Sequence, residues 1–270
     1  MDMGFVSVLQ KIVYPCPSSF IKVWSVVNLV SMAHLAISEA RGKHLQYSKF
    51  WNVGSGKSKT KQINLSARTG MLMIYTPAFL VSAASLGLFQ QEGLRFLLLG
   101  SALALHFFKR IFEVMYVHKY SSSMVLESVL TISLGYAIPS GSMLYLQHLA
   151  QGFPEPQVDL KCYGIVLFLL GISGNFYHHY LLSMLRTERN DKEYMVPKGG
   201  LFDLVICPHY LFEILSFFGM SLIAQTLYAY CVAISTTFYL MGRSYATKRW
   251  YISKFEDFPK NVRALIPFVF

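Results

Sequence analysis

Charge is scarce in this sequence. Asp, Glu, Lys and Arg make up 14% of its 270 residues, whereas soluble domains contain about 25%. Hydrophobic residues make up 54% of the chain, aromatic residues make up 15%, and the mean hydropathy is +0.41. These values exclude an ordinary soluble domain and predict a protein that crosses a membrane several times.

Several binding motifs are also missing. The chain has no Gly-x-Gly-x-x-Gly fingerprint, so any dinucleotide must bind outside a Rossmann fold. Its four cysteines, Cys16, Cys162, Cys207 and Cys231, are scattered rather than placed at metal-ligand spacing, and we interpret them as reduced packing residues. The net charge of +10 comes without a nucleic-acid motif. It suits either a cytosolic excess of basic loops or an anionic soluble ligand.

Long apolar runs are what the sequence does have, and they predict an all-α integral membrane protein. We expect about seven transmembrane helices of roughly 20 residues each, in a single membrane domain spanning residues 1–270, because no soluble linker or repeat divides the chain. The expected spans are Phe20–Glu39, Gly70–Phe89, Leu94–Val117, Met124–Gln147, Cys162–Leu185, Leu204–Ile223 and Gln225–Tyr245.

The charges of the loops predict an orientation. The segment Arg41–Arg68 and the basic-aromatic tail that follows Tyr245 are rich in Lys and Arg, whereas the loop Phe153–Lys161 is weakly acidic. With seven spans, the basic segments share one side of the membrane. The positive-inside rule then places the N-terminus in the lumen and the C-terminal tail in the cytosol.

Ionisable side chains inside the apolar runs predict a functional site. Glu213 lies in the apolar stretch Leu201–Leu240, and an ionisable group at this depth costs about 2.5–3.5 kcal/mol by insertion scales. Residues three or four apart share a helix face, and three spans have polar residues at this spacing. They are His106, Arg110 and Glu113 in the third span, Asn175, His179 and Arg186 in the fifth, and His209 and Glu213 in the sixth.

All three polar stripes fall in the cytosolic half of the predicted membrane, which predicts a polar chamber open to the cytosol. The simpler alternative is that these residues clamp helices together without a ligand. The pair His178-His179 also invites a metal interpretation. Because neither a carboxylate nor a third histidine stands at ligand spacing, we expect no metal.

The C-terminal sequence resembles the steroid 5α-reductase family. The resemblance rests on Lys254–Lys260, Arg263–Phe270, Tyr194–Phe202 and Cys207–Glu213, and it extends over residues 107–270. It implies an integral protein of the endoplasmic reticulum membrane that uses NADPH to reduce a carbon–carbon double bond of a lipid. The family also contains polyprenol reductases and trans-2-enoyl-CoA reductases, which some features of the third span resemble more closely.

The resemblance also implies roles for individual residues. The positions that contact NADPH in steroid reductases are occupied here by Arg110, Asn175, Arg186, Tyr194, His209, Glu213, Arg243 and Tyr251. His179 replaces an aspartate of the family, and we expect it to bind the cofactor as well. Arginines can bind the phosphates of such a cofactor in a forked geometry. The cofactor would supply the hydride, and the protein would supply orientation and a dry pocket.

The residues at the expected substrate-binding positions differ from those of the family. Tyr75 stands where steroid reductases have a glutamate that binds the 3-keto oxygen, and Phe107 and Thr247 replace a tyrosine and a histidine. We therefore expect Tyr75 to be the catalytic hydrogen-bond donor. The first hypothesis is reduction of a 3-oxo-Δ4-steroid to its 5α product. The alternatives are a trans-2-enoyl-CoA or polyprenol reductase and a non-catalytic membrane scaffold.

Overall fold

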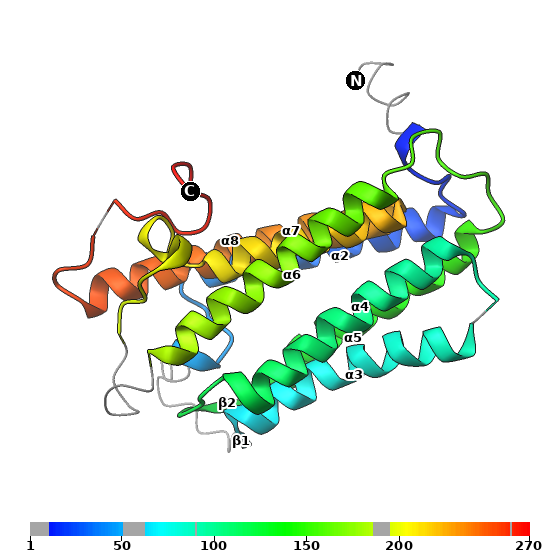
Figure 1. Cartoon of the computed structure of the whole chain (residues 1–270). Helices are drawn as coiled ribbons and strands as arrows, with labels where there is room; N and C mark the ends of the chain where they lie inside the picture. Colours follow the sequence, from blue (N-terminus) through cyan, green and yellow to red (C-terminus); the bar gives the residue numbers. More distant parts are fainter. Residues whose placement is uncertain (1–10, 51–62, 90, 186–194, 260) are drawn as a thin grey trace.

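The structure, a computed structural model, describes residues 11–50, 63–89, 91–185, 195–259 and 261–270. Within these ranges the chain forms seven α-helices, three short helical turns and a two-stranded antiparallel sheet (Figure 1). The α-helices are α2 Ser19–Ala40, α3 Ala67–Leu88, α4 Leu94–Phe112, α5 Leu126–Ala150, α6 Lys161–Met184, α7 Pro208–Ala224 and α8 Leu227–Lys254. The short elements are η1 Ser48–Phe50, η2 Glu113–Val117, η3 Gly200–Asp203, β1 Asn64–Ser66 and β2 Ser123–Val125.

The apolar runs of the sequence become the longest helices. Four of them, α2, α3, α5 and α6, are long and apolar enough to cross a bilayer, and α7 is a shorter apolar helix. The chain is therefore an all-α, multi-pass membrane protein with a small sheet between β1 and β2 at one end of the helices.

Two of the expected boundaries were wrong. The sixth helix begins at Pro208 rather than at Leu204, because proline lacks a backbone N–H and suits the first helical position, where none is needed. The seventh helix continues to Lys254 rather than ending at Tyr245, so the first part of the expected tail is helical. Cys207, directly before α7, is buried and provides the turn into that helix.

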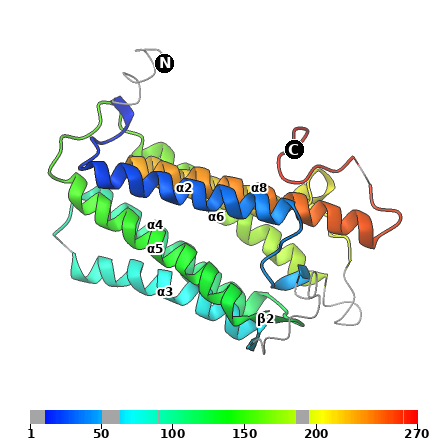
Figure 2. The ribbon, with the colours of Figure 1, turned by 180° about the vertical axis from the view of Figure 1, so that it is seen from behind.

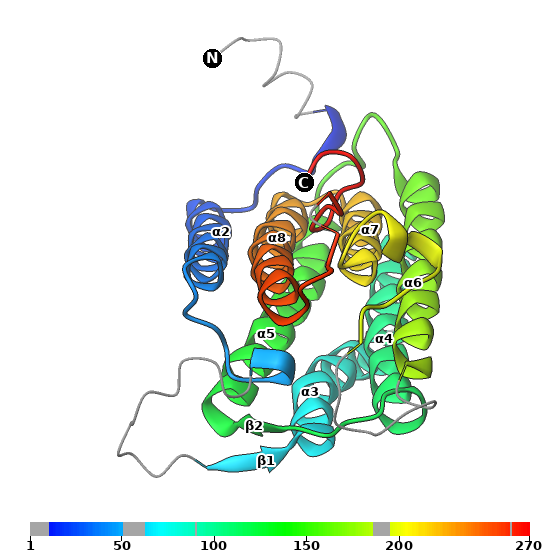
Figure 3. The same ribbon diagram turned by 90° about the vertical axis from the view of Figure 1, so that its left-hand side faces the viewer.

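The helices run roughly side by side and alternate in direction. α2 packs along α8, α6 packs along α7, and α3 packs against both α4 and α5, while α7 also contacts α4 and α8 (Figures 1 and 2). Figure 3 looks along the helices from the end where α2, α4, α6 and α8 finish and α3, α5 and α7 begin. This end also contains β1, β2 and η3, and we call it the loop-rich end.

Glycines allow α6 and α7 to lie very close together. A Cβ atom at Gly171 of α6 would lie 2.5 Å from the backbone nitrogen of Ser216, and one at Gly219 of α7 would lie 2.5 Å from that of Phe168. Small residues at helix contacts let backbones approach in this way. The close approach fixes the faces of α6 and α7 that look towards the other helices.

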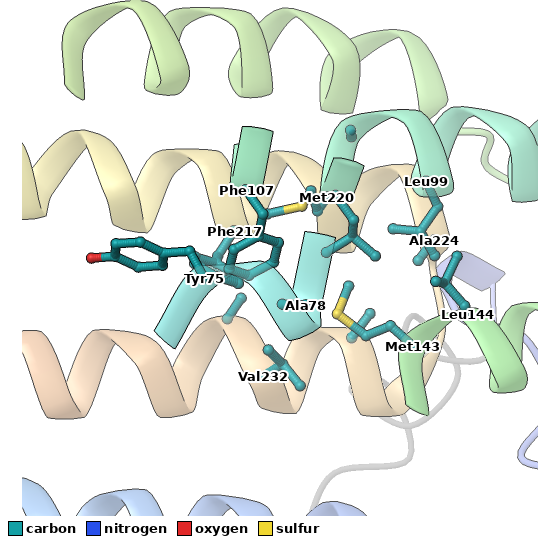
Figure 4. Packing of buried hydrophobic residues seen from close by; sticks show 14 of the residues in the cluster. Tyr75, Ala78, Leu99, Phe107, Met143, Leu144, Phe217, Met220, Ala224 and Val232 are labelled. Carbon is teal, nitrogen blue, oxygen red and sulfur yellow. The ribbon is translucent and has the colours of Figure 1, made fainter. Parts of the chain in front are cut away.

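A buried apolar cluster is shared by several helices. Its members include Leu99, Phe107, Phe217 and Met220, which come from α4 and α7 (Figure 4). Tyr75 lies at the margin of the cluster, and its hydroxyl points away from the other labelled side chains. The apolar packing therefore holds the Tyr75 ring, while its hydroxyl lies outside the cluster and can contact polar groups.

A proline near Tyr75 shapes α3. Pro77 has no N–H to donate to the carbonyl oxygen of Met73, four residues earlier, and such a gap usually bends a helix. The Ser133 hydroxyl of α5 donates to this oxygen instead, at 3.0 Å. A hydrogen bond from the neighbouring helix thus satisfies the group that the proline leaves without a partner.

A charged cluster closes the end opposite to the loop-rich end. Arg95, at the start of α4, donates to the Ile223 carbonyl oxygen at 2.7 Å and to Gln225 Oε1 at 2.9 Å. Its other terminal nitrogen donates to the carboxylates of Glu155 and Asp159. The loop between α5 and α6 is thereby fastened to the turn between α7 and α8.

Candidate active site

A chamber of about 270 Å³ lies among the helices near the loop-rich end, and its wall contains charged and polar as well as apolar side chains. Residues from the segment before η1 to the last turns of α8 line it, so no single part of the chain forms it alone. Of the residues expected at the site, the chamber is lined by Tyr75, Arg110, His179, His209, Glu213, Arg243 and Tyr251. Arg186 and Tyr194 lie outside the described residues.

Three charged residues at the end of α4 form one cluster. Glu113 is completely buried, and its carboxylate lies 3.0 Å from Lys109 Nζ and 3.2 Å from Arg110 Nη1. The spacings of three and four residues place the three side chains on one helix face. An uncompensated buried carboxylate is strongly destabilising, and the two cations neutralise this one.

The α6 residues meet this cluster directly. His179 Nδ1 lies 3.0 Å from Glu113 Oε1 and 3.0 Å from Arg110 Nη1. Asn175 Oδ1 accepts a hydrogen bond from Lys109, and Asn175 Nδ2 donates to the His209 carbonyl oxygen at 2.7 Å. Asn175 therefore links α4 to the first turn of α7 from behind the chamber wall.

Two tyrosines stand beside the carboxylate of Glu213. The Tyr136 hydroxyl of α5 donates to Glu213 Oε1 at 3.2 Å. Tyr75 accepts a hydrogen bond from Arg110 Nη2, and the Arg110 guanidinium lies 4.6 Å from the centre of its ring. The rings of Tyr75 and Tyr136 are 5.8 Å apart, so the chamber has two phenols near one carboxylate and one guanidinium.

Arg243 is held by a carboxylate from α2. Its Nη1 donates to both oxygens of Glu39, at 2.8 Å and 2.9 Å, and the guanidinium lies 4.1 Å from the Tyr47 ring centre. Glu39 also accepts from the Leu45 amide at 3.1 Å, and it lies 2.7 Å from His44 Nδ1. Arg243 lines the chamber, but much of its hydrogen-bonding capacity ties the α2–η1 segment to α8.

His106 is a stripe residue that lies apart from the charged cluster. It is buried against the rings of Phe107 and Phe217, and neither ring nitrogen has a hydrogen-bond partner within the described residues. It does not line the chamber. The expected face was inferred from spacing alone, whereas α4 turns this histidine towards the apolar cluster.

The two adjacent histidines have different environments. His178 Nδ1 donates to the Gly174 carbonyl oxygen at 2.7 Å, and its Nε2 accepts from the Leu201 amide at 3.1 Å, so it supports the turn at η3. His179 does have a carboxylate and a second histidine near it, Glu113 and His118, contrary to what spacing along the sequence indicated. Lys109 and Arg110 already neutralise that carboxylate, and their charges oppose a metal cation.

Four residues of this region were missed from the sequence. Lys109 could have been found, because it stands one helical turn before Glu113. Spacing along the sequence could not have revealed the other three, Glu39, Tyr136 and Lys49, because their partners are distant in the chain. Lys49 is partly buried at the chamber wall, and its Nζ lies 4.9 Å from the Tyr251 ring centre and 5.6 Å from that of Trp250.

Comparison with known proteins identifies the family. Residues 122–270 match the sequence profile described as 3-oxo-5-alpha-steroid 4-dehydrogenase. The chain belongs to this family. It is therefore a multi-pass membrane protein of a family of oxidoreductases, and the resemblance inferred from its C-terminal motifs is confirmed.

Individual relatives cover most of the chain. It is similar to 3-oxo-5-alpha-steroid 4-dehydrogenase 2 of Macaca fascicularis, with 30% identity over 221 residues, or 78% of this chain and 84% of the relative. The corresponding protein of Homo sapiens is 29% identical over 256 residues, or 90% and 94% of the two chains. Polyprenal reductase 1 of Oryza sativa subsp. indica is 38% identical over 109 residues, which cover 39% and 30%.

Proposed function

We propose that this protein is an NADPH-dependent reductase that converts a 3-oxo-Δ4-steroid to its 5α-reduced product. The observation that supports this most strongly is the chamber, where Arg110, Glu213 and Tyr75 meet at the margin of the apolar cluster. A polar site beside an apolar wall suits a lipid that reacts at a carbonyl-bearing end. Family membership supports the same reaction, since the similar primate proteins are named for it.

The chamber suits a large anionic cofactor. His209 Nδ1 and Arg110 Nε are buried and have no hydrogen-bond partner within the described residues. Arg110 Nε–H can therefore donate a hydrogen bond to a ligand, and His209 Nδ1 can form one with it. We assign binding of NADPH to Arg110, Asn175, His179, His209, Glu213, Arg243 and Tyr251, together with Arg186 and Tyr194. Arginine forks bind phosphate, and Glu213 is suited to the carboxamide or ribose. Asn175 does not line the chamber and would act through Lys109 and the first turn of α7.

Catalysis requires a hydrogen-bond donor to the carbonyl oxygen of the substrate. When bound, NADPH would supply a hydride for the β-carbon of a conjugated carbonyl, so the carbonyl oxygen is the atom at which the protein must stabilise negative charge. Tyr75 can donate its phenolic hydrogen to that oxygen, because Arg110 holds the hydroxyl in the chamber. The α-carbon would take its proton from water, and Tyr136, whose hydroxyl donates to Glu213, is a second phenol near the same place.

We further propose that all seven helices cross the endoplasmic reticulum membrane. In this arrangement the loop-rich end and the tail after α8 face the cytosol, which the basic residues of Arg41–Arg68 favour. The acidic loop held by Arg95 then faces the lumen. A cytosolic chamber mouth gives soluble NADPH access, while a steroid reaches the site from the bilayer.

The test uses purified full-length protein in detergent with NADPH. It is incubated with 3-oxo-Δ4-steroids, trans-2-enoyl-CoAs and polyprenals, and consumption of NADPH is followed together with product identification. We expect turnover of the steroids. Binding of NADPH without turnover of any steroid contradicts the proposed substrate, and an absence of thermal stabilisation by NADPH contradicts the reductase and favours a scaffold.

A polyprenal is the second candidate substrate. Identity to the rice polyprenal reductase reaches 38% over its matched region, higher than to the primate steroid enzymes, although that region is shorter. Tyr75 also replaces the glutamate expected for a 3-keto steroid. The same assay decides between the two, because the α,β-unsaturated aldehyde and the cyclic enone give different products.

A further inference from the structure

Lys49 is a lysine of the chamber wall that the proposed function leaves without a role. It lies in η1, in the segment that connects α2 to β1, and it lines the chamber together with Tyr251 and Arg243. Its ammonium group stands over two aromatic rings at the end of α8, Trp250 and Tyr251. Contacts of this kind hold a cation but do not neutralise it.

The pairing of Lys49 differs from that of the arginines in the same wall. Arg110 is paired with Glu113, and Arg243 is paired with Glu39. In the part of the chain that the structure describes, no carboxylate lies within salt-bridge distance of Lys49. Among these described residues, the chamber therefore presents a lysine whose charge no carboxylate balances.

The surroundings of Lys49 make this charge costly. Burial lowers the pKa of its ammonium group to about 8, and the neighbouring charge of Arg243 acts in the same direction. Cys207, which also faces Lys49, would oppose this only as a thiolate, and burial raises the pKa of that thiol to about 11. An anion bound here would provide the missing balance.

We propose that Lys49 binds a phosphate monoester on the ribose of an adenine nucleotide that enters the chamber. A compact dianion suits a single ammonium group, which offers a point charge where an arginine would offer a planar fork. The proposal rests on the proposed function, since NADPH has such a phosphate at the ribose 2′ position. Coenzyme A has one at the 3′ position, and the experiment separates the two sources.

The probes are nucleotide fragments that differ only in this group. Dissociation constants of 2′,5′-ADP, 3′,5′-ADP and 5′-AMP are measured by calorimetry on the full-length protein in detergent. We expect Lys49→Gln to raise the dissociation constant of 2′,5′-ADP about tenfold, because a hydrogen bond to a charged group is lost. The dissociation constant of 5′-AMP should change by less than about twofold. Lys49→Arg should retain most of the preference.

Lys254→Gln is the matched control. Lys254 ends α8 and is exposed, so its substitution removes the same charge from the same end of the molecule without altering the chamber wall. We expect all three fragments to bind this variant as they bind the unchanged protein. An equal effect of both substitutions would show that only overall charge matters and would overturn the proposal.

A pH series on the unchanged protein gives an independent measurement. The Lys49 ammonium is present below its pKa of about 8 and is lost as the pH rises through it. The 2′-phosphate is a dianion on both sides of this value, since its own pKa is about 6. The ratio of the 5′-AMP and 2′,5′-ADP dissociation constants should therefore be large at neutral pH and fall in alkaline solution.

The outcomes are distinct. If Lys49→Gln weakens the binding of 3′,5′-ADP alone, Lys49 binds a phosphate and the ligand is a coenzyme A derivative. Equal weakening of 5′-AMP and 2′,5′-ADP by Lys49→Gln means that the lysine only supports the fold, which contradicts the proposal, as does a pH-independent ratio. If NADPH binds but Lys49→Gln changes nothing, the inference fails and the reductase stands; if NADPH does not bind, the proposed function fails.

Discussion

Tyr75 combines apolar packing with a polar contact inside one side chain. Its ring lies at the margin of the buried cluster, and its hydroxyl meets Arg110 in the chamber. Removing only the hydroxyl separates the two roles, because phenylalanine retains the ring and its packing. A loss of activity in that variant would then report on hydrogen bonding rather than on folding.

We predict that Tyr75→Phe lowers kcat for the steroid about 100-fold, since positioned proton donors contribute roughly 10²–10⁴-fold to rates. Binding of NADPH should change little. The measurement is steady-state turnover alongside thermal stabilisation by the cofactor. Tyr163→Phe, at an exposed position of α6, provides the matched control; full turnover by Tyr75→Phe would assign the donor to another group, with Tyr136 the next to test.

Helix packing offers a test at the scale of elements. A methyl group at Gly219 would meet the backbone of Phe168, which cannot move aside as a flexible side chain can. Gly219→Ala should therefore destabilise the protein by about 1–3 kcal/mol, the usual range for overpacking. The measurement is the melting temperature in detergent.

Gly87→Ala is the control for this prediction. Gly87 lies in α3, and a Cβ atom there would have no neighbour within 4 Å. Alanine favours helix more than glycine does, so this variant should melt at the same temperature or higher. Similar melting temperatures for the two variants would mean that α6 and α7 are not held as closely as described.

The positions of the helices could be predicted because hydrophobic runs and charge spacing involve residues that are close together in the sequence. It predicted the helices to within a few residues, apart from the start of α7 and the end of α8. The chamber depended partly on contacts between distant segments, which spacing cannot reveal. Glu39 and Arg243 are one example, and the contact of His179 with Glu113 from another helix is a second.

At the scale of the whole molecule, the Arg95 cluster links stability to pH. Partial burial opposes the charge of Glu155 and Asp159, but hydrogen bonds from Arg95 to Glu155 and from Lys161 to Asp159 lower the pKa of both carboxyl groups. Groups with a depressed folded-state pKa stabilise the protein above their unfolded pKa, near 4, and lose this contribution as the pH falls through the folded value.

We predict that the melting temperature falls as the pH drops below about 4, and that a double variant with Glu155→Gln and Asp159→Asn falls less steeply. Thermal melts in detergent between neutral and strongly acidic pH measure this. Glu127→Gln, at an exposed position on α5, should leave the steepness unchanged. An unaltered slope in the double variant would exclude these two carboxylates as its source.

The charges at the end of α4 have a consequence for how the protein is made. Lys109, Arg110 and Glu113 pair within one short stretch of chain, whereas their partners on α6 are synthesised later. A lone charge at the bilayer centre costs about 2.5–3.5 kcal/mol, and internal pairing lowers that cost during insertion. The ribosome can therefore deliver α4 to the membrane with the Glu113 carboxylate already paired and one net positive charge remaining, before the rest of the chamber exists.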